Sequence, residues 1–273
     1  MISAVISLGG IGLGAAVILG LAAKKFAVEV DPKEEAILEV LPGANCGACG
    51  FPGCGGFAKA VVAGEADPSA CSPGGSSVTA KIAEIMGVEA ASAEPMVAVV
   101  NCQGDNQKAQ NKYKYLGIQT CASAQMLAGG PKACPGGCLG LGDCMVACPF
   151  GAIEITAEGL AVINREKCVG CKKCVSACPR NVITMVPKSA TVSVLCNSHD
   201  KGPAVKKYCQ VGCIGCTLCK KTAEEVYAID NFLAHVTYDT YDHEKAKAGM
   251  EKCPTKCIRD FAEGYPEGSS FQP

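Results

Sequence analysis

The residues with the clearest capacity for chemistry in this sequence are its cysteines, which number 21 in a chain of 273 residues. Their densest run, CVGCKKCVSACP, has the spacing C-x2-C-x2-C-x3-C-P from Cys168 to Cys178. Thiolates at this spacing bind [4Fe–4S] clusters, and where two clusters lie together the fourth cysteine of each run binds the other run's cluster. The run therefore predicts a second cluster nearby and a cysteine that returns from it.

The second cluster is expected from the preceding run, CPGGCLGLGDCMVACP, which ends at Cys148 in the same Cys-Pro pair. Leu141 stands where the second cysteine of this run belongs, so one thiolate is missing. Cys134 is the nearest replacement, and Cys102 and Cys121 are alternatives to it. The crossed arrangement predicts two ligand sets, namely Cys148 with Cys168, Cys171 and Cys174, and Cys178 with Cys138, Cys144 and Cys134.

The run CIGCTLC predicts a further cluster, although it lacks its fourth cysteine because Ala223 stands at that position. Cys253, in the stretch CPTKCI, belongs to the next Cys-Pro pair and is expected to complete the group, with Cys257 as an alternative. The predicted ligands are Cys213, Cys216, Cys219 and Cys253.

The first cysteine group, NCGACGFPGC, has a different spacing, C-x2-C-x4-C-x16-C when Cys71 is included. Four thiolates also suit zinc, so a zinc ribbon is an alternative for this group. The loop is rich in glycine, however, and small residues allow backbone N–H groups to approach the sulfides of an iron–sulfur cluster. The predicted cluster ligands are Cys46, Cys49, Cys54 and Cys71.

Five cysteines remain after these four clusters, and their number leaves room for a fifth cluster. The alternative is that several of them are buried thiols, which are common in protein cores. The short apolar runs VAVVNC and VSVLC each end in a cysteine and each lead to a C-x3-C pair, which predicts a duplicated module. The remaining cysteines are Cys102, Cys121, Cys196, Cys209 and Cys257.

Residues 2–23 form an uncharged apolar stretch that Lys24 and Lys25 follow. A helix of about 20 apolar residues spans a bilayer core, and basic residues mark its cytoplasmic side. A signal peptide would instead carry positive charge ahead of its apolar core. The stretch predicts a single-pass transmembrane helix in the inner (plasma) membrane, with the C-terminal domains in the cytoplasm.

Composition and motifs exclude several classes of function. The formal charge of −1 indicates no nucleic-acid partner, and the tight cysteine runs favour metal binding over disulfides. The three histidines lie far apart, and no P-loop or dinucleotide-binding motif follows a predicted strand. We therefore expect no catalytic residue, and a chain that transfers single electrons.

These features predict an α+β chain with an N-terminal transmembrane helix, a small four-cysteine iron–sulfur domain and duplicated ferredoxin-like iron–sulfur modules. Stretches rich in Gly, Ser and Pro suggest where one part ends and the next begins. The expected domains are a transmembrane anchor at 1–25, a four-cysteine [4Fe–4S] domain at 26–90, a two-cluster ferredoxin-like module at 91–190, and a second such module with the tail at 191–273.

Together the motifs resemble the B subunit of the Rnf complex, the membrane-bound ferredoxin:NAD⁺ oxidoreductase that couples electron flow to Na⁺ or H⁺ translocation. The resemblance covers nearly the whole chain and rests on the N-terminal membrane helix, the block NCGACGFPGCGGFA with Cys71, the ferredoxin runs and the CPTKCI ending. It implies reduced ferredoxin as electron donor and other membrane subunits that hold the NAD and flavin sites. The cysteine count predicts at least four [4Fe–4S] clusters and leaves room for a fifth. The alternative is an iron–sulfur electron-transfer subunit of another membrane-associated oxidoreductase, of the hydrogenase or formate dehydrogenase type.

Lysine pairs lie beside three of the cysteine runs, at Lys172-Lys173, Lys206-Lys207 and Lys220-Lys221. They are either solvated charges that offset the clusters or a landing site for an acidic ferredoxin. Because the first pair lies within a cluster-binding loop, it is the favoured landing site, with Lys220-Lys221 second.

Overall fold

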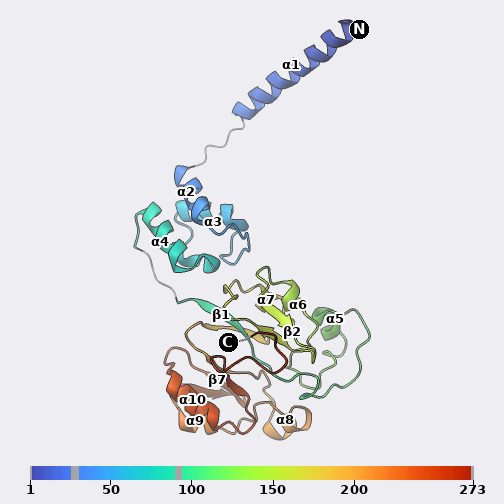
Figure 1. Ribbon diagram of the computed structural model, residues 1–273, viewed down its shortest axis with the longest axis vertical. Helices are drawn as coiled ribbons and strands as arrows, with labels where there is room; N and C mark the ends of the chain where they lie inside the picture. Colours follow the sequence, from blue (N-terminus) through green and yellow to red (C-terminus); the bar gives the residue numbers. More distant parts are fainter. Residues whose placement is uncertain (1, 26–30, 90–93, 272–273) are drawn as a thin grey trace.

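The computed structural model describes residues 2–25, 31–89 and 94–271, without the side chains of residues 2–8 and 23. Figure 1 shows an N-terminal helix, then a small helical unit, then a larger unit of short helices and two-stranded sheets. The first two predicted domain boundaries, at 25–26 and 90–91, involve residues outside this description.

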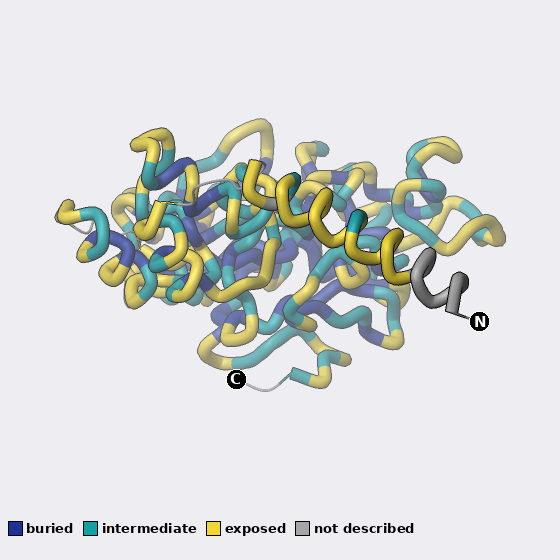
Figure 2. The backbone as a smooth tube through the Cα atoms, turned by 90° about the horizontal axis from the view of Figure 1, so that it is seen from above, coloured by how far each residue is buried: buried dark blue, intermediate teal, exposed yellow. Residues whose placement is uncertain are grey.

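Helix α1 (Ile2–Lys25) forms over the apolar stretch. The burial of its residues is described from Gly9 on, and Figure 2 shows the tube coloured as exposed along most of this part of the helix. Among the residues that the structure describes, no helix has both the length and the apolar character needed to cross a membrane. The predicted transmembrane helix and single-pass topology are therefore wrong.

The small unit packs three helices around a compact apolar core. Helix α2 (Pro32–Val40) begins at a typical helix-start pair, because Asp31 accepts a hydrogen bond from the backbone N–H of Lys33 at 2.8 Å and Pro32 occupies the first turn. The other elements are α3 (Gly53–Val62), the 3₁₀ turns η1 (Pro68–Ala70) and η2 (Ser72–Gly74), and α4 (Gly75–Met86). Ile37, Phe57 and Ile82 fill the core between them.

The first half of the larger unit pairs its opening strand with the strand that follows the second Cys-Pro pair. Strand β1 (Met96–Val100) lies antiparallel to β4 (Ile183–Pro187), with Ala98 opposite Met185. Between them come α5 (Cys121–Met126), α6 (Asp143–Val146), the hairpin of β2 (Ile153–Ile155) and β3 (Ala161–Ile163), and α7 (Lys173–Ala177).

The second half repeats this pattern. Strand β5 (Val192–Val194) lies antiparallel to β8 (Ile258–Asp260), which follows the third Cys-Pro pair. Between them come α8 (Gly202–Tyr208), α9 (Leu218–Thr222), the hairpin of β6 (Tyr227–Asp230) and β7 (Leu233–Val236), and α10 (His243–Glu251). The two halves therefore place their cysteines at equivalent points of a common arrangement.

Cysteines make up a large part of the buried core in both halves. Leu160, Val162 and Ile183 pack with cysteines in the first half, and Val192, Val226 and Tyr227 do so in the second. With so few large side chains, the core is arranged around the sulfur atoms rather than around aromatic rings.

Candidate metal centres

The cysteines gather into five groups, which we call sites A to E. Sites B to E each surround a cavity of similar empty volume, between 310 and 380 Å³. The groups are site A with Cys46, Cys49, Cys54 and Cys71; site B with Cys148, Cys168, Cys171 and Cys174; site C with Cys121, Cys138, Cys144 and Cys178; site D with Cys102, Cys134, Cys196 and Cys209; and site E with Cys213, Cys216, Cys219, Cys253 and Cys257.

Site A lies in the small helical unit, at the start of α3. The side chain of Asn45 accepts a hydrogen bond from the backbone N–H of Cys54 at 2.8 Å and so fixes the loop before the helix. Burial raises the pKa of the Cys71 thiol, and the charges of Cys54 and Cys49 raise it further. Three of these cysteines pack against the same core as Phe57.

Site B contains the crossed ligand that the sequence predicts. Cys148, which ends the first run, lines the same cavity as the three leading cysteines of the second run. Lys172 adopts a left-handed conformation with φ of 61° and starts α7, which directs Cys174 inwards. The Sγ atom of Cys168 accepts a hydrogen bond from the backbone N–H of Ala98 at 3.4 Å, which ties this site to β1.

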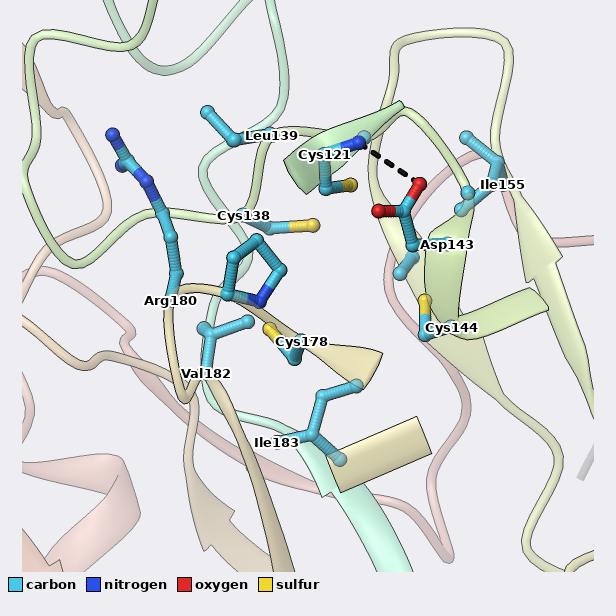
Figure 3. Close-up of a pocket in the computed structure, with 14 residues that line it drawn as sticks. Cys121, Cys138, Leu139, Asp143, Cys144, Ile155, Cys178, Arg180, Val182 and Ile183 are labelled. Carbon is cyan, nitrogen blue, oxygen red and sulfur yellow. Dashed lines mark hydrogen bonds between the residues drawn. The ribbon is translucent and has the colours of Figure 1, made fainter. Parts of the chain in front are cut away.

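Site C has Cys121 in the place that Leu141 leaves without a thiol. Figure 3 shows the sulfur atoms of Cys121, Cys138, Cys144 and Cys178 directed towards the space between them. Asp143, at the start of α6, accepts hydrogen bonds from the backbone N–H groups of Cys121 and Ala122, each at 2.9 Å. This carboxylate therefore holds the start of α5 against α6 and positions the Cys121 thiol.

Site D lies between the two halves and receives two cysteines from each. Cys102 follows β1 and Cys196 follows β5, so these two occupy equivalent positions of the repeat. Cys134 and Cys209 each begin a C-x3-C pair and are equivalent in the same way. The structure thus places Cys134 here and not in site C.

Backbone hydrogen bonds connect site D to its neighbours on both sides. The N–H of Cys138, in site C, donates to the Sγ atom of Cys102 at 3.4 Å. The N–H of Cys213, in site E, donates to the Sγ atom of Cys196 at 3.2 Å. Each half therefore supplies the same kind of link from one site to the next.

Site E holds one cysteine more than the others. The Sγ atoms of Cys253 and Cys257 lie 3.6 Å apart. The hydrogen bond from Cys257 lowers the pKa of Cys253 to about 5, and its bonds to Cys213 and Cys253 raise the pKa of Cys257 itself. Cys253 is thus the readier thiolate of this pair, and Cys257 the readier thiol.

Burial favours the protonated form of several thiols in the other sites. It raises the pKa of Cys138, Cys174 and Cys196 to about 12 each, and the pKa of Cys134 to about 11. Iron binds the thiolate form, so loading these sites has to release the thiol protons.

Two buried cations lie beside sites C and D. Arg180 donates to the backbone carbonyls of Cys134 at 2.6 Å and Gly137 at 2.9 Å, so it fixes the loop between two ligands. Burial lowers the pKa of the Lys132 ammonium, whereas the negative charges of Cys102 and Cys138 act in the opposite direction. Cysteine charges act on both cations, and the carboxylate of Asp105 also acts on Lys132.

Four thiolates suit either a single zinc ion or a [4Fe–4S] cluster, and the two require different geometry. Within the described parts of the chain, no three His, Cys, Asp or Glu side chains converge closely enough to hold one metal ion. A single zinc ion would draw its sulfurs to about 2.3 Å from one centre. A [4Fe–4S] cluster binds each thiolate through a different iron atom, so it fits four sulfurs around a wider cavity.

Curated relatives are similar in sequence to this chain over almost its whole length. The chain is 42% identical to the B subunit of the Na⁺-translocating ferredoxin:NAD⁺ oxidoreductase complex of Acetobacterium woodii, over 94% of this chain and 77% of that protein. It is 40% identical to the B subunit of the ion-translocating oxidoreductase complex of Methanosarcina acetivorans, over 94% and 97%. It is 42% identical to the B subunit of the proton-translocating ferredoxin:NAD⁺ oxidoreductase complex of Clostridium ljungdahlii, over 93% and 90%.

The chain belongs to the family of B subunits of ion-translocating oxidoreductase complexes, the Rnf complexes. The resemblance that the sequence motifs indicate is therefore confirmed. Membership also decides against the hydrogenase and formate dehydrogenase alternatives.

Three family models match separate parts of this chain. They are described as "Putative Fe-S cluster" over residues 41–73, "4Fe-4S dicluster domain" over 135–185, and "4Fe-4S single cluster domain of Ferredoxin I" over 210–260. These ranges contain the ligands of sites A, B and E, and three of the four in site C. The cysteines of site D, and Cys121 of site C, lie outside all three ranges.

Proposed function

We propose that this chain holds five [4Fe–4S] clusters, one in each of sites A to E, and relays electrons from reduced ferredoxin to the other subunits of an ion-translocating ferredoxin:NAD⁺ oxidoreductase. The observation that carries the proposal is the pair of N–H to sulfur links on either side of site D. Because Cys138 donates to Cys102 and Cys213 donates to Cys196, sites C, D and E form one uninterrupted series.

The proposed ligands are four cysteines for every site. Site C takes Cys121 in place of the expected Cys134, because Cys121 lines its cavity and Cys134 lines that of site D. Site E takes Cys253, because its pKa is low and because it is the cysteine of the Cys-Pro pair. The groups of four then use all cysteines except Cys257.

Bound [4Fe–4S] clusters supply one-electron chemistry, and the protein supplies burial, hydrogen bonds and order. Sites B and C are adjacent because each of the two central runs contributes to both. Cys46 of site A lies close enough to site B for its charge to add to the effect of burial on the pKa of Cys171. The resulting order is A, B, C, D, E.

The donor and the partners follow from the family. The relatives from Acetobacterium woodii and Clostridium ljungdahlii are named as parts of ferredoxin:NAD⁺ oxidoreductase complexes. This chain has no nucleotide motif in its sequence, so the NAD and flavin chemistry falls to other subunits.

Ion translocation requires a membrane between two compartments, and we infer that the complex holds this chain at that membrane. Exposed apolar side chains of α1, among them Leu13 and Ile18, suit contacts with those subunits.

Iron and acid-labile sulfide analysis of the anaerobically purified chain tests the number of sites. Five clusters of four irons each require about 20 iron atoms per chain. Reduction of the loaded protein by ferredoxin, and transfer to NAD⁺ in the complete complex, tests the role. A value near 16 irons that is insensitive to Cys209→Ser would exclude a cluster at site D, and failure of ferredoxin to reduce the protein would exclude it as donor.

A further inference from the structure

Lys132 is an unusual lysine, because only 1% of its surface is exposed and it lines the cavity of site D. Its ammonium donates a hydrogen bond to the backbone carbonyl of Gly104 at 2.8 Å. Among the ion pairs of the described residues, none involves Lys132. A buried ammonium without a negative partner is costly, so its partner has to be sought in the cavity that it lines.

The buried carboxylate near Lys132 is already satisfied. Asp105 lies 3.1 Å from the ammonium of Lys108 and accepts hydrogen bonds from the backbone N–H groups of Gln107 and Lys108. Its charge is therefore partly offset by Lys108, which also pairs with Glu267. Thiolates are the larger negative influence on Lys132, led by Cys102 of site D and followed by Cys138 of site C.

The other sites do not have this arrangement. Among the described residues, no lysine or arginine lines the cavity of site E. Lys172 lines site B but is exposed, so water screens its charge. Arg180 lines site C, but its guanidinium donates to backbone carbonyls, including that of Cys134. Of the four cavities in this part of the chain, only that of site D is lined by a buried ammonium.

We propose that Lys132 raises the reduction potential of site D above that of site E. The inference rests on the proposed function, because it requires a [4Fe–4S] cluster at site D. Reduction adds one electron, supplied by the ferredoxin donor, and neither makes nor breaks a bond. The reduced cluster carries one more negative charge than the oxidised cluster, so a fixed positive charge in a dry cavity favours the reduced form. The step from site E to site D is then downhill.

The repeat supplies a matched control for Lys132. Lys132 precedes Cys134 by two residues, and Lys207 precedes Cys209 by two residues in the second half. Lys207 is exposed in the last turn of α8, so it has the same place in the repeat without the burial. Substitution of Lys207 therefore removes a positive charge at the equivalent position of the repeat and leaves the cavity of site D intact.

The test is an EPR-monitored redox titration of the full chain purified with its clusters. The Cys209→Ser variant identifies the signal of site D by its loss. In Lys132→Met and Lys132→Gln we expect reduction of that site to be at least tenfold less favourable, which is 59 mV for one electron. Lys132→Arg should restore the potential, and Lys207→Met should leave it unchanged. Lys132→Gln can keep the hydrogen bond to Gly104, so it separates the charge from the bond.

The outcomes distinguish this inference from the proposed function. If Cys209→Ser removes neither iron nor an EPR signal, site D holds no cluster. The part of the proposed function that assigns a cluster to site D is then wrong. If site D is loaded in both neutral variants and its potential stays at the wild-type value, the tuning role of Lys132 is overturned. Loss of the site D cluster in both neutral variants would make Lys132 a structural requirement and would also overturn that role.

Discussion

At the scale of single residues, Cys257 shows how a cysteine can lie against a cluster site without being one of its ligands. It follows the Cys-Pro pair of Cys253 by four positions, as Ala152 follows Cys148 and Val182 follows Cys178. Ala152 and Val182 are buried and line the cavities of sites B and C. Cys257 is likewise 1% exposed, so it occupies a core position of the repeat.

Substitutions of Cys253 and Cys257 should therefore differ in effect. Cys253→Ser removes a proposed ligand, and we expect the loss of about four iron atoms and of the site E signal. Cys257→Ala introduces the residue type that Ala152 provides at the equivalent position of site B. We therefore expect full iron content and only a small loss of stability. Iron analysis and EPR of the two purified variants provide the measurement. Retention of the cluster in Cys253→Ser together with its loss in Cys257→Ala would reverse the assignment.

Some cysteines of the five sites could be assigned from the sequence alone, and others could not. The leading cysteines of sites A and B follow from spacing alone, because local runs fix them. Cys121 could not be placed from spacing, since Asp143 brings its helix to site C from a distant part of the chain. The grouping of site D was within reach, because the two repeated segments mark Cys102 and Cys196, and Cys134 and Cys209, as equivalent pairs.

At the scale of elements, α6 and α7 explain why each of the two central cysteine runs contributes to both site B and site C. The two short helices pack together, and each carries one cysteine within the helix and one at or just after its end. Cys144 within α6 faces site C, whereas Cys148 after it faces site B. Cys174 within α7 faces site B, and Cys178 at its end faces site C. A single turn of chain thus separates ligands of different clusters.

Paired substitutions test this crossing. Cys148→Ser should remove or convert the site B cluster, although Cys148 belongs to the run that contributes mainly to site C. Cys144→Ser, four residues earlier on the same element, should affect site C and spare site B. Each variant should lose up to about four iron atoms if its cluster is not retained. EPR spectra that show the same damaged cluster in both variants would contradict the crossed arrangement.

Element boundaries followed the sequence where capping signals were strong. Asp31 caps α2 and Pro32 occupies its first turn, as these residue types commonly do at helix starts. The short helices that carry cysteines have no periodic pattern long enough to predict them. Apolar character alone misled the assignment of α1, because no helix of the described residues has the length and apolar character needed to cross a membrane.

At the scale of the whole molecule, the series of sites has two different ends. Site A lies in the small helical unit next to site B, and Figure 1 shows this unit beside α7 and far from α9 and α10. Site E lies at the opposite end of the series. All 21 cysteines are within the described residues, and among them Cys216 of site E is the exposed one. An external donor therefore has its shortest access at site E.

The surface around site E has the composition of a transient docking site. Leu218 is 42% exposed and Phe232 is 46% exposed, and the carbonyl of Phe232 lies 3.9 Å from the Sγ atom of Cys213. Lys220 and Lys221 belong to the adjacent helix α9. Short-lived redox complexes use small interfaces and depend on charge for their association rate. We propose this surface as the docking site for ferredoxin in place of Lys172-Lys173, because the small helical unit lies beside that pair.

Charge removal at the two lysine pairs distinguishes these docking sites. In the double variant Lys220→Gln and Lys221→Gln, we expect reduction by ferredoxin to slow by about tenfold at low salt, because steering by opposite charges is lost. The rate of this variant should also depend less on salt than the wild-type rate. The Debye length falls from ~10 Å at 0.1 M to ~3 Å at 1 M, so at high salt the charges of the wild-type lysines are already screened. The matched variant Lys172→Gln and Lys173→Gln should keep the wild-type rate. Stopped-flow measurement with ferredoxin, and with a small uncharged reductant as reference, separates docking from damage to the clusters. A slow rate in the Lys172 and Lys173 variant alone would place the donor at site B and reverse the direction of electron flow along the series.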